Sequence, residues 1–88
     1  MNMHEKLQQA SKMLKDAQAA VLQAQGQDLQ ILEQAQRMVE QAENELKNLQ
    51  NQAGREATEN AQFQQAFEEL HDIRQQVQEA QQNINDIP

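Results

Sequence analysis

Between Leu32 and Ala53 the sequence repeats apolar residues at alternating steps of three and four, and every residue between them is polar except Met38. Because a helix has 3.6 residues per turn, this spacing keeps the apolar side chains on one side of a single helix. The repeat therefore predicts a coiled-coil-like heptad seam. Its members are Leu32, Ala35, Val39, Ala42, Leu46, Leu49 and Ala53.

Two further stretches carry the same kind of seam. The first consists of Met3, Leu7, Ala10, Leu14, Ala17, Val21 and Ala24, and the other of Phe63, Ala66, Leu70, Ile73, Val77, Ala80 and Ile84. Between the seams, Gly26 and Gly54 suit the left-handed conformation that ends helices. Asp28 is predicted to cap the second helix, and Thr58 or Asn60 the third. We expect helices over about 3–25, 29–53 and 60–84, with a short loop after Gly54.

Short turns between three helices of similar length predict an all-α fold, an up-down-up antiparallel three-helix bundle in a single domain over 1–88. The alternative architecture is an extended hairpin that completes its core by dimerising. Many seam positions are Ala, which lets helices approach closely but buries little apolar area. We therefore expect a stability of only a few kcal/mol.

The predicted neighbours follow from the positions beside each seam, if the second helix lies in the middle. Across the first two helices, the edges pair one ionic and two apolar sets of residues, and across the second and third they include one ionic pair. The predicted pairs are Lys6–Glu45, Met13–Met38 and Ala20–Ile31, and then Glu43–Arg74, Gln36–Gln81 and Gln50–Phe67.

Composition excludes several classes of function. The net charge is −7, with +1 over 1–25, −3 over 26–53 and −5 over 54–88. An acidic surface repels phosphate, so we expect no nucleic acid partner. The chain has no cysteine for a disulfide, thiolate site or catalytic thiol. No stretch approaches the roughly 18 apolar residues that span a bilayer, and the first fifteen residues do not resemble a signal peptide, so no membrane partner and a cytoplasmic location are expected.

Candidate chemical sites are weak. Glu68 and His71 have the Glu-x-x-His spacing of di-iron bundles, but the motif occurs once and Glu68 is expected to face water. His4 is read as an exposed residue near the chain start, and the acidic run of Glu40, Glu43 and Glu45 cannot surround an ion. Ser11 has no activating partner nearby. We therefore expect no catalytic residue, no metal site and no cofactor, and hence no enzyme.

Three apolar residues lie beside the seams. Met13 and Met38 are expected to cover the contacts between helices. Phe67 is one step beyond Ala66, so it either covers the end of the core or makes a partner contact.

The leading functional hypothesis is a small non-enzymatic protein–protein interaction or structural module. It would offer a polar, Gln-rich helix face to an unidentified protein or to a second copy. The alternative is a carrier of a small apolar ligand or lipid within the bundle, which the Ala-rich seams argue against because close backbones leave little cavity. An interfacial membrane helix is disfavoured because the polar faces are not rich in Lys and Arg.

The stretch from Phe63 through Gln76 to Ala80, with the Gln- and Ala-rich helical composition, resembles small uncharacterised helical proteins of spore-forming bacilli. These belong to domain-of-unknown-function families. The resemblance lies in composition and helical pattern across most of the chain, and it contains no diagnostic motif. It implies a cytoplasmic bacterial protein with no assigned activity, and it transfers no functional residue.

Overall fold

The structure, a computed structural model, describes residues 3–24 and 28–85, with side chains described through residue 83. Within these residues it contains four helices, α1 (Met3–Ala24), α2 (Leu29–Ala53), α3 (Arg55–Thr58) and α4 (Ala61–Asn85). The predicted all-α class is confirmed. The long helices begin and end within one residue of the predicted bounds, although Gln25 and the proposed helix stop Gly26 lie outside the described residues.

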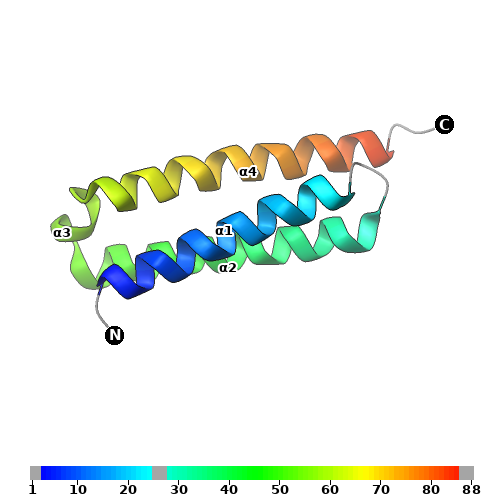
Figure 1. Cartoon of the computed structure of the whole chain (residues 1–88). Coiled ribbons are helices and arrows are strands. Elements are labelled where there is room, and N and C mark those ends of the chain that lie inside the picture. Colours follow the sequence, from blue (N-terminus) through cyan, green and yellow to red (C-terminus); the bar gives the residue numbers. More distant parts are fainter. Residues whose placement is uncertain (1–2, 25–27, 86–88) are drawn as a thin grey trace.

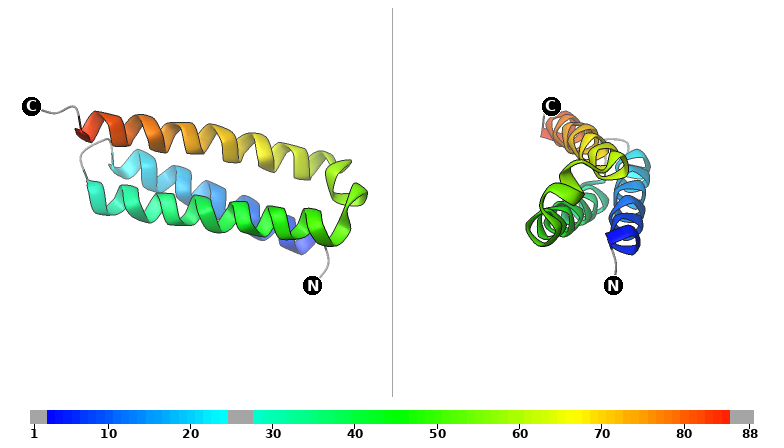
Figure 2. Two further views of the ribbon diagram at one scale, coloured as in Figure 1. Left: turned by 180° about the vertical axis from the view of Figure 1, so that it is seen from behind. Right: turned by 90° about the vertical axis from the view of Figure 1, so that its left-hand side faces the viewer.

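The three long helices lie side by side along their full length. α1 and α4 run in the same direction, and α2 runs in the opposite direction (Figure 1). Seen from the end, they stand at the corners of a triangle (Figure 2). Each long helix contacts the other two. The core therefore closes within one chain, and the alternative extended hairpin is not what this structure adopts.

The predicted seams form the core. Every described seam residue is buried except Met3 and Ala53, which are half-buried near helix ends and pack against the core. The side chain of Ile84 lies outside the described residues. Two residues off the seams, Ala20 and Ala57, are buried as well. No polar or charged residue is buried in the part of the chain that the structure describes, so the core itself consists of apolar side chains.

Side-chain caps begin two of the helices. Asp28 Oδ1 accepts a hydrogen bond from the backbone N–H of Ile31 at 3.2 Å, which confirms the predicted cap of α2. Asn60 Oδ1 accepts from the N–H groups of Gln62 and Phe63 at 2.8 and 3.2 Å. Of the two predicted caps for the last long helix, Asn60 is therefore the one used. Thr58 instead donates its hydroxyl to the carbonyl of Arg55.

The loop predicted after Gly54 is wrong, because residues Arg55–Thr58 form the short helix α3. The methyl group of Ala57 is fully buried and covers the core between the ends of α2 and α4. The N–H groups of Ala57 and Thr58 both donate to the Gly54 carbonyl at 3.1 Å. A four-residue helix is too short to show an apolar period, which is why the sequence pattern did not reveal it.

Gly54 joins α2 to α3 with a φ of 58° and a ψ of −123°. The positive φ is as predicted, but the ψ differs from the left-handed helical value of about +45°. An L side chain rarely adopts this backbone conformation, whereas glycine does so freely. The conformation lets the chain leave α2 and enter α3 without a longer connection.

The predicted register of α2 against α4 is confirmed. Glu43 Oε2 and Arg74 Nη2 form an ion pair at 2.5 Å. Gln36 and Gln81, also predicted to be neighbours, line one cavity of about 110 Å³ beside that pair. The side of α2 that carries Gln36 and Glu43 therefore faces the side of α4 that carries Arg74 and Gln81, as predicted.

The predicted contact between Lys6 and Glu45 is not the one formed, because Lys6 Nζ donates to Gln52 Oε1 at 2.8 Å instead. Both side chains are long, so this hydrogen bond shows that Lys6 reaches toward the end of α2 but does not determine which residues of the two helices lie level. The pairing of Met13 with Met38 and of Ala20 with Ile31 stays a prediction.

Candidate functional site

Side chains close the seam between α1 and α2. The hydrogen bond from Lys6 to Gln52 crosses it at one end. Met13 and Met38 lie on the same edges of these helices, and both are half-buried and packed against the core. Their predicted role as cover for the helix contacts is confirmed.

The seam between α2 and α4 is closed by charge. Glu43 pairs with Arg74 across it, and Lys47 on α2 lies 3.7 Å from the same carboxylate. The Glu43 side chain is only 19% exposed, so two cations neutralise a carboxylate that is largely removed from water. Because Glu43 is paired in this way, it is not available to bind a cation together with Glu40 and Glu45.

The seam between α1 and α4 is open by comparison. A surface groove of about 390 Å³ runs along it, which we call the α1/α4 groove. It is lined by Gln8, Ser11, Lys12 and Lys15 from α1, and by Gln62, Gln65, Ala66 and Glu69 from α4. α1 and α4 contact each other about as extensively as α2 and α4 do, and less than α1 and α2 do. The groove is thus a hollow at one of the two less extensive seams.

Short side chains at the edges explain why the groove exists. Ser11 is half-buried and Ala66 is buried, so neither can extend across the seam. The half-buried side chains of Gln62 and Glu69 form the wall on the α4 side. At the other two seams, Met13 and Met38 pack against the core and Glu43 pairs with Arg74. Ser11 and Ala66 provide no such cover, so this part of the α1/α4 seam stays open.

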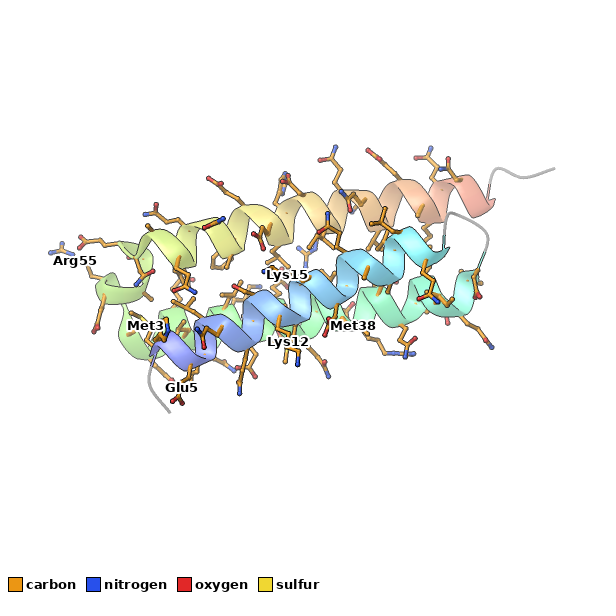
Figure 3. The ribbon with its side chains drawn as sticks, in the orientation of Figure 1. Met3, Glu5, Lys12, Lys15, Met38 and Arg55 are labelled. Carbon is orange, nitrogen blue, oxygen red and sulfur yellow. The ribbon has the colours of Figure 1, made fainter. Side chains whose placement is uncertain are left out.

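The two walls of the groove differ in charge. Lys12 and Lys15 leave neighbouring turns of α1 and are exposed (Figure 3). Glu69 is the carboxylate that lines the opposite wall. Over their whole lengths, α1 contains three lysines and two carboxylates, Glu5 and Asp16, whereas α4 contains Arg74 and four carboxylates. The groove therefore offers hydrogen-bonding groups between a basic wall and an acidic wall.

Phe67, the candidate partner contact, lies outside this groove. Its ring meets that of Phe63 edge to face, with centroids 4.9 Å apart and planes at 61°. It is half-buried and packs against the core. These contacts fit the role of covering the core, and a contact between Phe67 and a partner stays a prediction.

The structure does not assemble the other candidate residues into a site. Glu68 and His71 are both exposed on α4, as the solvated-face interpretation predicted, and His4 is exposed near the start of α1. In residues 3–24 and 28–85, no group of three or more His, Cys, Asp or Glu side chains is arranged to hold a metal ion. Ser11 lies in the groove, but no histidine lines it.

Sequence reasoning did not identify the α1/α4 groove. The available signal was the pair of short residues, Ser11 and Ala66, at positions that face each other once α1 and α4 lie side by side. Two exposed leucines, Leu22 and Leu29, were also not singled out. They flank the α1/α2 turn, at the end of the molecule away from α3 (Figure 1).

Comparisons with known proteins complete the description. No family model, no curated protein and no solved structure matches this chain. Among the described residues, none of the helices has both the length and the apolar character needed to cross a membrane.

Proposed function

We propose that this protein is a small non-enzymatic interaction or structural module of the cytoplasm. Its three long helices act as an up-down-up antiparallel bundle with coiled-coil-like seams, and α3 belongs to the connection between α2 and α4. The bundle is a rigid support, and its polar helix faces make contact with another protein chain. The same reading accommodates the resemblance to small helical proteins of spore-forming bacilli.

The α1/α4 groove is the observation that carries this proposal. Seams α1/α2 and α2/α4 are covered by long side chains, whereas the α1/α4 groove keeps a volume of about 390 Å³ between two helices that run in the same direction. A groove between two helices accepts a third helix, which is a recurring mode of recognition. Amide, hydroxyl, ammonium and carboxylate groups along both walls can pair with the polar groups of such a helix.

The chemistry of the groove also favours this proposal over a carrier of apolar ligands. Seven of its eight lining residues are polar or charged, and the eighth is Ala66. An apolar molecule placed there would leave these groups without hydrogen-bond partners, at a cost of about 1–3 kcal/mol for each one buried. A polar helix surface would satisfy them.

Photo-crosslinking in the native cell tests the proposal. Gln65 is exposed and lines the groove, so Gln65→p-benzoylphenylalanine places a reactive group at its mouth. Gln41 is exposed on α2 and does not line the groove, which makes Gln41→p-benzoylphenylalanine the matched control. The proposal expects a discrete adduct with a protein chain from position 65 and none from position 41. Equal labelling from both positions, or no adduct from either, would contradict it.

A further inference from the structure

We propose that the face formed by α1 and α4 binds a second copy of this chain, so that two copies associate through their α1/α4 faces. This inference rests on the proposed function, because it names the partner for the face that contains the α1/α4 groove. In the pair, α1 of each copy would lie against α4 of the other. The placement of charge along the two walls of the groove and the size of this face support the pairing.

Charge complementarity supports the pairing. Lys12 and Lys15 line the α1 wall of the groove, and Glu69 lines the α4 wall. Asp72 is exposed one turn further along α4. A second copy that brings its α4 to this α1 supplies carboxylates to both lysines.

Symmetry makes the complementarity mutual. α1 and α4 run in the same direction, so a two-fold axis perpendicular to the bundle sets α1 of one copy antiparallel to α4 of the other (Figure 1). The lysines and the carboxylates then meet twice, once on each side of the axis. Partner proteins that carry a single charge sign would match only one wall of the groove.

The size of the face fits a pair of copies. The molecule measures 49 × 18 × 16 Å, so a long face approaches the roughly 800 Å² per partner that a stable complex of ordinary size buries. The groove walls are polar, and most of the pairs would stay close to water. Such contacts determine which surfaces meet more than they hold them together, so the association should be weak and should depend on salt.

Sedimentation equilibrium of the full chain, at rising protein concentration, tests this inference with charge reversals. One variant carries Lys12→Glu with Lys15→Glu, and a second carries Glu69→Lys with Asp72→Lys. Each variant alone should associate at least tenfold more weakly than the parent, because like charges then meet across the axis. An equimolar mixture of the two should regain association, since each then supplies the charges that the other requires.

A matched control separates local pairing from net charge. Arg37 on α2 and Arg55 on α3 are exposed and do not line the groove, and Arg37→Glu with Arg55→Glu changes the net charge by the same amount as the first variant. This control should associate as the parent does, and circular dichroism should find every variant folded. A parent that stays monomeric, a control as weak as the groove variants, or a mixture that fails to recover would overturn the inference. If the parent is monomeric while position 65 crosslinks to a different protein, self-association is wrong and the interaction module stands. If position 65 crosslinks to nothing, both are wrong.

Discussion

Arg74 of α4 and Glu43 of α2 meet across the α2/α4 seam, where Arg74 Nη2 lies 2.5 Å from Glu43 Oε2. The Arg74 side chain is 44% exposed and the Glu43 side chain 19% exposed, so the pair lies at the edge of the core rather than inside it. Lys47 approaches the same carboxylate from within α2. This contact aligns the two helices, and its energy should be that of a partly exposed ion pair.

A double-mutant cycle measures that energy. Glu43→Gln and Arg74→Gln, alone and together, should give a coupling of about 0.5–1 kcal/mol in the free energy of unfolding, because water still reaches the arginine. Urea denaturation at low and high salt provides the values, and the coupling should shrink with salt. A coupling of zero at low salt would mean that the pair does not hold α2 against α4.

Substitution by aspartate should destabilise the protein strongly at buried leucines and only slightly at an exposed one. Leu46→Asp or Leu70→Asp would place a carboxylate at a position that is 0% or 4% exposed, among Ala and Leu side chains that cannot hydrogen-bond it. Either variant should be largely unfolded by circular dichroism at 25 °C, since the total stability of such a domain is only a few kcal/mol.

Leu22→Asp is the matched control, because Leu22 is 64% exposed on α1. This variant should stay helical and lose no more than about 0.5 kcal/mol. A Leu46 or Leu70 variant that melts with the parent, or a Leu22 variant that unfolds, would contradict the assignment of the core.

The backbone at Gly54 predicts opposite effects for two mirror-image residues. Gly54→Ala should lower the free energy of unfolding by about 1–3 kcal/mol, because an L residue is strained at a φ of 58° with a ψ of −123°. A Cβ at this position would meet no atom within 4 Å, so the loss would come from the backbone rather than from a clash.

Replacement of Gly54 by D-alanine tests whether backbone strain is the cause of that loss. The mirror image of the observed conformation is an ordinary extended one, so the D residue fits without strain and restricts the unfolded chain. A chain assembled by chemical ligation with D-alanine should be at least as stable as the parent. If the L and D variants lost stability equally, the conformation of Gly54 would not be the reason.

The seams could be predicted from sequence because burial follows the helical period, and the period is visible in one chain. Leu7, Leu46 and Leu70 are all buried as expected. Ala57 could not be recognised, because a buried residue in a single turn has no repeat around it. The register of α2 against α4 was also within reach, since Glu43 and Arg74 are the ionic match on facing edges.

The partner of Lys6 could not be predicted from the sequence. A lysine side chain is long enough to reach more than one polar residue on the facing helix, so Lys6 suits both Glu45 and Gln52. An exposed pair contributes too little to choose between them. The α1/α4 groove was also not apparent, because its lining residues come from two helices far apart in the sequence.

Disulfide trapping tests this arrangement most directly, and the chain has no cysteine of its own to interfere. Met13 and Met38 are both half-buried against the core at the α1/α2 seam, and the predicted register makes them neighbours. Met13→Cys with Met38→Cys should therefore oxidise within one chain and leave the helix content unchanged. Met13→Cys with Glu45→Cys should stay reduced under the same conditions. The reverse outcome, or bridges that form only between chains, would contradict the hairpin of α1 and α2.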